Sequence, residues 1–296
     1  MTVATSLFFD RSRNAMTALS ARADALSTQI STGKKLAAPS DDPLAYARLR
    51  GLATQGTDGA AYAGNLKTAA SVLSTADTTL TSIRAQVTRA SELAVQANNG
   101  TLSADNRRSI AEELSGIAET LASLANVKDT RGQPLFGGAD GGAALTTTAG
   151  GPRFASGTVP SIPINDGQSV QPSVTASALF QFGGTDTLSV ITSFAATLRA
   201  GGSIGTAGST AIAQLQTAGD LVDTAQASVG ARAARVELEQ STQTAASVER
   251  ESLRSGLEDT DVTAAITELQ KTMTTLQATQ ASFSKLSSLS LFDYLK

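Results

Sequence analysis

The sequence predicts a mainly α-helical protein: a long antiparallel coiled-coil bundle built from the N- and C-terminal segments, with a small β-rich insert between them. Three observations predict this fold. Apolar residues recur at three-, four- and seven-residue spacings in both outer parts of the chain. Aromatic residues make up only 4% of the 296 residues, Trp is absent, and much of the apolar share is alanine, which favours closely packed helices over a thick core. Glycine, threonine and most prolines gather near 137–208, where the helical spacing stops.

These patterns divide the chain into five predicted parts. Residues 1–42 form a coiled-coil helix and a joint, and they pair with the C-terminal coiled-coil helix, 257–296. Residues 43–136 and 205–256 form the two halves of a helical rod domain, and 137–204 form a β-rich outer insert domain.

The first predicted helix, over about 5–32, carries one narrow apolar stripe. At about 25 cal/mol per Å² of buried apolar surface, a pair of such helices barely offsets its ordering entropy. We therefore expect both ends of the chain to order only on assembly. The stripe consists of Phe8, Ala15, Leu19, Ala23, Leu26 and Ile30.

A joint follows this helix. Gly33 stands where a C-terminal helix cap would, and two lysines come next, beside the negative end of the helix dipole. Pro39 disfavours helix at the residue before it, and Asp42 followed by Pro43 is typical of an N-cap and the first helical position. The predicted joint and capping residues are Gly33, Pro39, Ser40, Asp41, Asp42 and Pro43.

Two ligand-binding alternatives exist for this joint. A P-loop needs a second glycine five residues before the Gly-Lys pair and a hydroxyl after it, but Thr28 and Lys35 occupy those positions. The adjacent Asp41 and Asp42 could be paired catalytic carboxylates or metal ligands, yet beside a proline they are typical of caps and turns. We therefore predict a joint and no ligand site.

The strongest periodicity lies in the predicted rod. Five heptads run to Ala97, Asn-Asn-Gly at 98–100 ends the helix, and Ser103 or Asp105 caps the next one to give a helical hairpin. A third rod helix begins near Thr210, and a second joint is predicted over 255–261. The predicted seams are Leu66, Leu73, Leu80, Val87 and Ala94 with Ala69, Ala76, Ile83, Ala90 and Ala97; then Ile110, Leu114, Ile117, Leu121 and Leu124; then Leu215, Ala218, Val222, Ala225, Val229 and Val236.

Short alternating runs between 137 and about 190 predict the strands of the insert. Asn165-Asp166-Gly167 is a turn signal, and a short helix is expected near 188–200. Gly202, Gly205 and Gly208 have the look of a nucleotide-binding loop, but no strand precedes them and no lysine follows. We predict a flexible return to the helices instead.

The last predicted helix ends in an apolar tip, "LSLFDYLK". Exposed aromatic side chains are costly unless something covers them, so we expect a partner, rather than packing within the chain, to cover Phe292 and Tyr294. The predicted assembly interface consists of Phe8, Leu19, Leu26 and Ile30 on the first helix and Ile266, Leu269, Met273, Leu276, Phe283, Leu291, Phe292, Tyr294 and Leu295 on the last.

Composition removes several classes of function. The chain has no cysteine and no histidine, which excludes disulfides, thiolate chemistry, the usual zinc sites and His-based triads. With a net charge of −3 and scattered basic residues, we expect no nucleic-acid partner. No apolar run reaches 18 residues and the start lacks a basic region, so neither a membrane span nor a cleavable signal is expected. We predict a non-enzymatic protein without cofactor or metal.

Two long stretches carry a resemblance to a known family. "STGKKLAAPSDDPLAYARL" (31–49) and "SELAVQANNGTLSADNRRSIAEEL" (91–114) resemble bacterial flagellins and their relatives, in the right order. The resemblance covers roughly 1–137 and 205–296 and leaves the insert unexplained. Within the family, "PLFGG" (134–138) and "LSLFDYL" (289–295) are similar to the hook-associated branch that joins hook to filament, and the filament-subunit branch is the alternative.

The resemblance implies a structural role in the extracellular flagellum. It implies a homo-oligomeric ring at the hook–filament junction, with another hook-associated protein and filament flagellin as partners. It also implies export in an unfolded state through the flagellar secretion channel, with an export chaperone on the C-terminal helix. An immune receptor reads a Leu-Gln-Arg patch in flagellins; here the matching positions are Val87, Thr88 and Arg89, so only the arginine agrees.

Overall fold

The computed structural model describes the backbone of residues 2–99, 102–148, 150–201 and 204–293, and the side chains over the same ranges except 2–6, 8 and 286–293. Its contacts divide the chain into two compact units. The terminal unit comprises Met1–Thr57 with Ala246–Lys296, and the rod unit comprises Asp58–Ala245. Each unit is described by itself.

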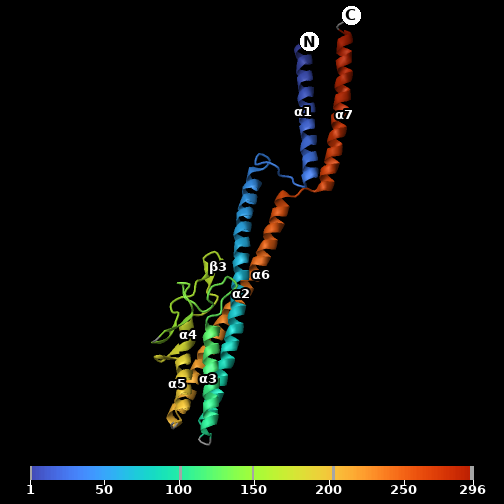
Figure 1. Cartoon of the computed structure of the whole chain (residues 1–296). Helices are drawn as coiled ribbons and strands as arrows, with labels where there is room; N and C mark the ends of the chain where they lie inside the picture. The colour runs from blue at the N-terminus through green and yellow to red at the C-terminus, as the bar shows by residue number, and fades with distance from the viewer. Residues whose placement is uncertain (1, 100–101, 149, 202–203, 294–296) are drawn as a thin grey trace. The chain divides into compact units, whose positions relative to one another are not determined.

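Long helices dominate the described part of the chain, and the strands between them are short (Figure 1). This confirms the predicted fold class. The helices are α1 (Thr2–Thr32), α2 (Pro43–Ala97), α3 (Ala104–Ala125), α4 (Ala176–Phe180), α5 (Thr187–Ala200), α6 (Gly205–Glu258) and α7 (Val262–Asp293). The strands are β1 (Leu145–Thr148), β2 (Gly151–Phe154), β3 (Ile162–Asn165), β4 (Gln168–Val170), β5 (Gln181–Phe182) and β6 (Thr185–Asp186).

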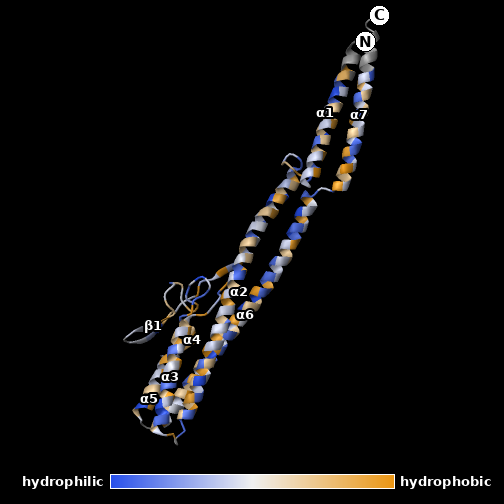
Figure 2. Cartoon of the chain, turned by 45° about the vertical axis from the view of Figure 1, so that its right-hand side comes forward, coloured by the Kyte–Doolittle hydropathy of each residue, from blue (hydrophilic) through white to orange (hydrophobic). Residues whose placement is uncertain are grey.

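The terminal unit is built on α1 and α7, which lie side by side and antiparallel (Figures 1 and 2). The first turns of α2 and the last turns of α6 complete it. Polar and apolar residues are mixed along both α1 and α7 (Figure 2), so neither helix presents a continuously apolar surface. An amphipathic pair of this kind buries a narrow seam only.

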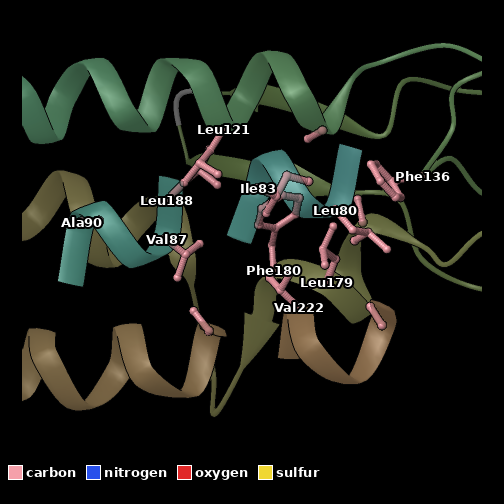
Figure 3. Packing of buried hydrophobic residues seen from close by; sticks show 14 of the residues in the cluster. Leu80, Ile83, Val87, Ala90, Leu121, Phe136, Leu179, Phe180, Leu188 and Val222 are labelled. Carbon is pink, nitrogen blue, oxygen red and sulfur yellow. The ribbon is translucent and has the colours of Figure 1, made fainter. Parts of the chain in front are cut away.

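The rod unit has its core along α2. All ten predicted seam residues from Leu66 to Ala97 are at most 1% exposed, which confirms the heptad assignment. Figure 3 shows Leu80, Ile83 and Val87 of α2 meeting Leu121 of α3 and Val222 of α6. Salt bridges flank these contacts, from Arg89 to Glu113 of α3 at 2.7 Å and from Arg84 to Asp223 of α6 at 2.6 Å.

The predicted seams of α3 and α6 are also confirmed, with Leu124 only partly buried against the core. Of the two predicted caps for α3, the structure uses Ser103, whose Oγ accepts a hydrogen bond from the Asn106 N–H at 3.2 Å. This side chain satisfies one of the N–H groups that the first turn of a helix leaves without a partner.

The predicted flexible return after the insert is wrong at two of its three glycines. Gly205 and Gly208 lie in the first turns of α6, while Gly202 lies outside the described residues. A Cβ on Gly208 would lie 2.5 Å from the Asn98 side-chain oxygen, so glycine lets α6 pass close to the end of α2. The second joint is also shorter than predicted, because Ser255 and Gly256 continue α6.

Within its described residues, the insert contains three two-stranded antiparallel hairpins and two helices. β1 pairs with β2, β3 with β4 and β5 with β6. The predicted turn at Asn165-Asp166-Gly167 is confirmed between β3 and β4, where Gly167 has a φ of +64° and the Asp166 N–H donates to Asn165 Oδ1 at 2.8 Å. The predicted helix near 188–200 is α5, whereas the five-residue α4 was not predicted.

The large side chains of the insert, together with Phe136 just before it, join the core of the rod rather than burying a core of their own. Phe136 and Phe180 are fully buried in the same cluster as the α2 seam (Figure 3). The ring of Phe180 stacks on that of Phe154, with 5.6 Å between their centroids. In the "PLFGG" stretch, a Cβ on Gly138 would lie 2.8 Å from the carbonyl oxygen of Ser156, so only glycine lets these two backbones approach.

Polar side chains bind the insert to α6 and hold the loop that leads from α3 into the insert. Arg232 donates to the carbonyl oxygens of Gln171 (3.0 Å) and Ser173 (2.6 Å). Before "PLFGG", the Asp129 carboxylate accepts the Arg131 N–H at 2.8 Å and two guanidinium N–H groups of the same residue at 2.8 and 2.9 Å. Burial opposes ionisation of Asp129, but these bonds hold its pKa below the usual value.

Candidate assembly site

The first joint begins at Gly33, which ends α1. Its backbone has a φ of +71°, in the left-handed region that favours glycine. Its N–H donates to the Gln29 carbonyl at 2.9 Å, which closes the last turn of the helix. The space that a Cβ would occupy is open, so the backbone angle alone requires glycine here.

Of the paired aspartates of this joint, Asp42 caps α2, as predicted, and Asp41 closes a turn within the joint. Asp41 Oδ2 accepts the backbone N–H groups of Ala37 and Ala38, at 2.9 and 2.8 Å. The bond from Ala38 and then that from Ala37 lower the pKa of Asp41. Asp42 Oδ1 accepts two N–H groups in the first turn of α2, both at 3.0 Å, and Pro43 is the first helical residue.

The two joints bind each other through their backbones. Lys34 and Asp259 form an isolated antiparallel bridge. The Thr260 N–H donates to the Gly33 carbonyl at 2.9 Å, and the Lys35 N–H donates to the Glu258 carbonyl at 2.8 Å. We call this contact, residues 33–35 with 256–260, the clasp.

Charged side chains reinforce the clasp. The Glu258 side chain is 14% exposed, and its carboxylate forms salt bridges with Lys34 across the clasp and with Arg254 one turn earlier in α6. The bond from Lys34, and then that from Arg254, lower the pKa of Glu258 against the opposing effect of burial. The Lys35 ammonium donates to the Gly256 carbonyl at 2.8 Å, where a cation satisfies the C-terminal end of α6.

The face of α1 that meets α7 has a strict three-and-four spacing. Each residue in the series is half-buried, whereas Ala15, predicted to lie in the stripe, is exposed. The prediction for Ala15 is therefore wrong, because the seam passes through its neighbour. The series is Phe9, Ser12, Met16, Leu19, Ala23, Leu26 and Ile30.

The matching face of α7 has the same spacing with smaller residues. Ala265 and Thr272 are buried, at 6% and 4% exposure, and the other members are half-buried. Two contacts cross between the helices: the rings of Phe9 and Phe283 meet edge to face at 5.3 Å, and Arg22 binds Glu268 at 2.8 Å. The α7 series is Ala265, Leu269, Thr272, Leu276, Thr279 and Phe283.

The structure divides the predicted interface between two faces. Six members lie in the seam between α1 and α7: Leu19, Leu26, Ile30, Leu269, Leu276 and Phe283.

Ile266 and Met273 lie on the other face, 41% and 48% exposed, in line with Val262, which is 42% exposed. Because these three are spaced by four and seven residues, they form one apolar stripe beside the seam. We call it the open stripe.

Five predicted interface residues, at the two ends of the chain, have side chains outside the described residues: Phe8, Leu291, Phe292, Tyr294 and Leu295. Their roles stay predictions.

Sequence reasoning missed six seam members and the clasp partners: Phe9, Ser12, Met16, Ala265, Thr272 and Thr279 on the seam, and Glu258 in the clasp. Phe9, Ser12 and Met16 could have been found by continuing the three-and-four spacing back from Ile30, although a serine and two adjacent phenylalanines obscure it. Thr272 carries no apolar signal at all. The salt bridge between Lys34 and Glu258 could not be predicted from the sequence, because its partners are far apart in the chain.

Other surfaces offer little chemistry. Among the described residues, no group of three or more His, Cys, Asp or Glu is placed to hold a metal ion.

A groove of about 480 Å³ between α2 and α6 is lined in part by Val87 and Thr88. Arg89 beside it is held by Glu113 and Glu92, at 2.7 and 3.3 Å. No helix in the described ranges is long and apolar enough to cross a membrane.

Comparison with protein families assigns the helical parts. The bacterial flagellin N-terminal helical region matches residues 6–140, and the bacterial flagellin C-terminal helical region matches 209–295. Together they cover well over half of the chain, including both joints and the seam. The chain belongs to the bacterial flagellin family. As a flagellin-family protein, it is a structural component of the bacterial flagellum.

Solved structures share this flagellin-family fold. A Vibrio parahaemolyticus protein assigned to the flagellar hook-associated proteins is 21% identical, with a TM-score of 0.69 over 74% of this chain and 100% of that one. Flagellar hook-associated protein 3 of Legionella pneumophila is 13% identical, with a TM-score of 0.64 over 70% and 98%. FlgL of Bacillus cereus is 18% identical, with a TM-score of 0.55 over 69% and 99%. A comparison with curated proteins gave no match.

Proposed function

We propose that this flagellin-family chain is a junction protein that connects the flagellar hook to the filament, and that it assembles as a homo-oligomeric ring through its terminal helices. The observation that carries assembly is the open stripe. α7 uses one face to pair with α1 and leaves Val262, Ile266 and Met273 exposed on another. An apolar stripe on a helix that already has a partner suits contact with a further helix.

The placement at the junction has separate support. The structural relatives named above are described as hook-associated proteins, or as FlgL. They match almost over their entire lengths, while between 69% and 74% of this chain is covered, so this chain has further residues that these relatives lack. The "PLFGG" stretch, with its buried Phe136 and its close approach at Gly138, lies where the rod meets the insert. On this proposal the protein is not an enzyme, and its partners are another hook-associated protein and filament flagellin.

Export in an unfolded state through the flagellar channel to the cell exterior is part of the same proposal. The seam between α1 and α7 contains Ser12, Ala23, Thr272 and Thr279, so it buries little apolar area and costs little to open. The apolar "LSLFDYL" end would bind an export chaperone before assembly.

The second candidate is a filament subunit. It is favoured by the family comparison, since both matching regions are described as flagellin. The two roles differ in place and abundance along the flagellum. Gold-labelled antibody against this chain, viewed by electron microscopy on intact cells, separates them. We expect one label spot at the boundary between hook and filament; label along the filament would instead establish the second candidate, and unlabelled flagella would refute both.

The open stripe can be tested by substitution in the same cells. We expect Ile266→Glu with Met273→Glu to leave the purified chain helical but to prevent its incorporation, because charges on the stripe cannot be buried against a neighbour. Thr274→Glu, which adds a charge on an exposed neighbouring position, is the matched control and should be incorporated. Normal incorporation of the double variant would show that the open stripe is not an assembly surface.

A further inference from the structure

We infer that the clasp sets the register in which α1 and α7 pair, with Glu258 as its positioning residue. The consequence for assembly rests on the proposed function, but the register itself is a property of the single chain.

The seam cannot set this register by itself. Leu269 and Leu276 are seven residues apart, as are Thr272 and Thr279, so a slip of one heptad along α1 keeps leucine and threonine at these seam positions. It separates the rings of Phe9 and Phe283, which are only half-buried, and the bond from Arg22 to Glu268. Such a slip moves the helices by about 10 Å relative to each other, at 1.5 Å per residue. The salt bridge between Arg22 and Glu268 opposes the slip only weakly, because its side chains are 61% and 37% exposed.

The clasp distinguishes the registers because its bonds are not repeated along the helices. It joins the residue that follows α1 to the joint that precedes α7 through the Gly33 carbonyl and the Thr260 N–H, at 2.9 Å. It joins the same joint to the end of α6 through the Lys35 N–H and the Glu258 carbonyl, at 2.8 Å. A heptad slip breaks both bonds at once and offers no replacement.

Glu258 couples the parts of the clasp electrostatically. Its carboxylate is the least exposed charged group there, and it binds Lys34 of the first joint and Arg254 of α6. The remaining charges nearby have other partners: Glu251 holds Arg254 from the far side at 2.6 Å, and Asp259 is bonded to Ser255. Loss of the Glu258 charge therefore removes the carboxylate that Lys34 binds across the clasp.

The absence of native cysteine makes the register measurable on the full chain. Spin labels on Asn14→Cys and Gln277→Cys, both exposed, report the distance between α1 and α7 by pulsed electron paramagnetic resonance. We expect one narrow distance in the otherwise unaltered chain. Glu258→Gln should lower the ratio of this population to all others by about threefold to fivefold, as for loss of a partly exposed ion pair.

Glu251→Gln is the matched control, because it removes a partner of Arg254 and leaves Lys34 paired; it should keep the narrow distance. Lys34→Gln should reproduce the effect of Glu258→Gln, and the double variant should be no worse than either single one. A narrow distance in Glu258→Gln, an equal effect of the control, additive losses, or a broad distance in the unaltered chain would each overturn the inference.

Discussion

Replacement of Gly33 tests whether the joint depends on one backbone angle. At a φ of +71°, an L-residue costs about 1–2 kcal/mol more than glycine. Alanine recovers about 0.4–1 kcal/mol by restricting the unfolded chain. Because a Cβ at Gly33 meets open space, no steric cost is added, and the net loss for Gly33→Ala is about 1 kcal/mol.

The loss should appear as local opening of the clasp. Hydrogen–deuterium exchange, followed by mass spectrometry on the full chain, reads the amides of Gly33, Lys35 and Thr260, whose bonds the substitution weakens. A loss of about 1 kcal/mol corresponds to about fivefold faster exchange. Gly33→Asn should cost less than Gly33→Ala, because asparagine tolerates the left-handed region, and Gly33→Val should cost more, because β-branched residues do not.

The control is Gly51→Ala in α2, within the same unit. Gly51 is helical and also has open space around its Cβ position, so alanine there should stabilise the helix by about 0.5–1 kcal/mol. Unchanged exchange in Gly33→Ala, or an order in which valine is tolerated better than asparagine, would refute the argument from the backbone angle.

Three further predictions concern the rod unit, each measured by chemical denaturation followed by far-ultraviolet circular dichroism. Gly138→Ala should destabilise by about 1–3 kcal/mol because its Cβ has no room, whereas Gly116→Ala, with room, should stabilise by up to about 1 kcal/mol; equal effects would contradict the steric account. Leu80→Ala should cost about 2–5 kcal/mol, and Leu238→Ala, at a residue 68% exposed, close to nothing. Asp129→Asn should cost about 1–3 kcal/mol at neutral pH. Since the folded-state pKa of Asp129 is lowered from 3.8, its contribution is present above that value and is lost as pH falls through the folded-state pKa, so the cost should vanish in acid.

The rod was predictable because its seam uses large aliphatic residues in strict heptads. Leu66, Leu73 and Leu80 repeat every seven residues without interruption. The second seam position, three residues after each, is alanine after the first two and Ile83 after the third. Burying such residues outweighs local preferences, so the pattern and the structure agree. The same reasoning succeeded for α1 from Leu19 to Ile30 but failed nearer its start, where Phe8 and Phe9 are adjacent and Ser12 occupies the seam.

The structures of the insert and of the clasp were harder to predict from the sequence, for two other reasons. Strands of two to four residues are too short to show the alternation that predicts a strand. The five residues of α4 are likewise too few to show the three- and four-residue spacing that predicts a helix. The clasp joins groups far apart along the chain: the Lys35 ammonium and the Gly256 carbonyl are 221 positions apart. Caps such as Asp42 were predictable, because their partners lie in the next turn.

The contrast between the two units suits the proposed function. The rod unit buries leucine, isoleucine and phenylalanine, so it keeps its structure without a neighbour. In the described seam of the terminal unit Ala265 and Thr272 are buried, the larger apolar side chains are half-buried, and the open stripe is exposed. On the proposed function, its helices gain further apolar contact when a second subunit arrives. A polar clasp specifies the register of the two helices through its hydrogen bonds. It does so without making the pair much more stable, because exposed ion pairs add little stability. On the proposed function, the terminal helices would separate for export and return to one alignment on assembly. The spin-label distances decide whether these helices are ordered before assembly. A broad distance distribution in the free chain would mean that contact with neighbouring subunits, and not the clasp, sets the register.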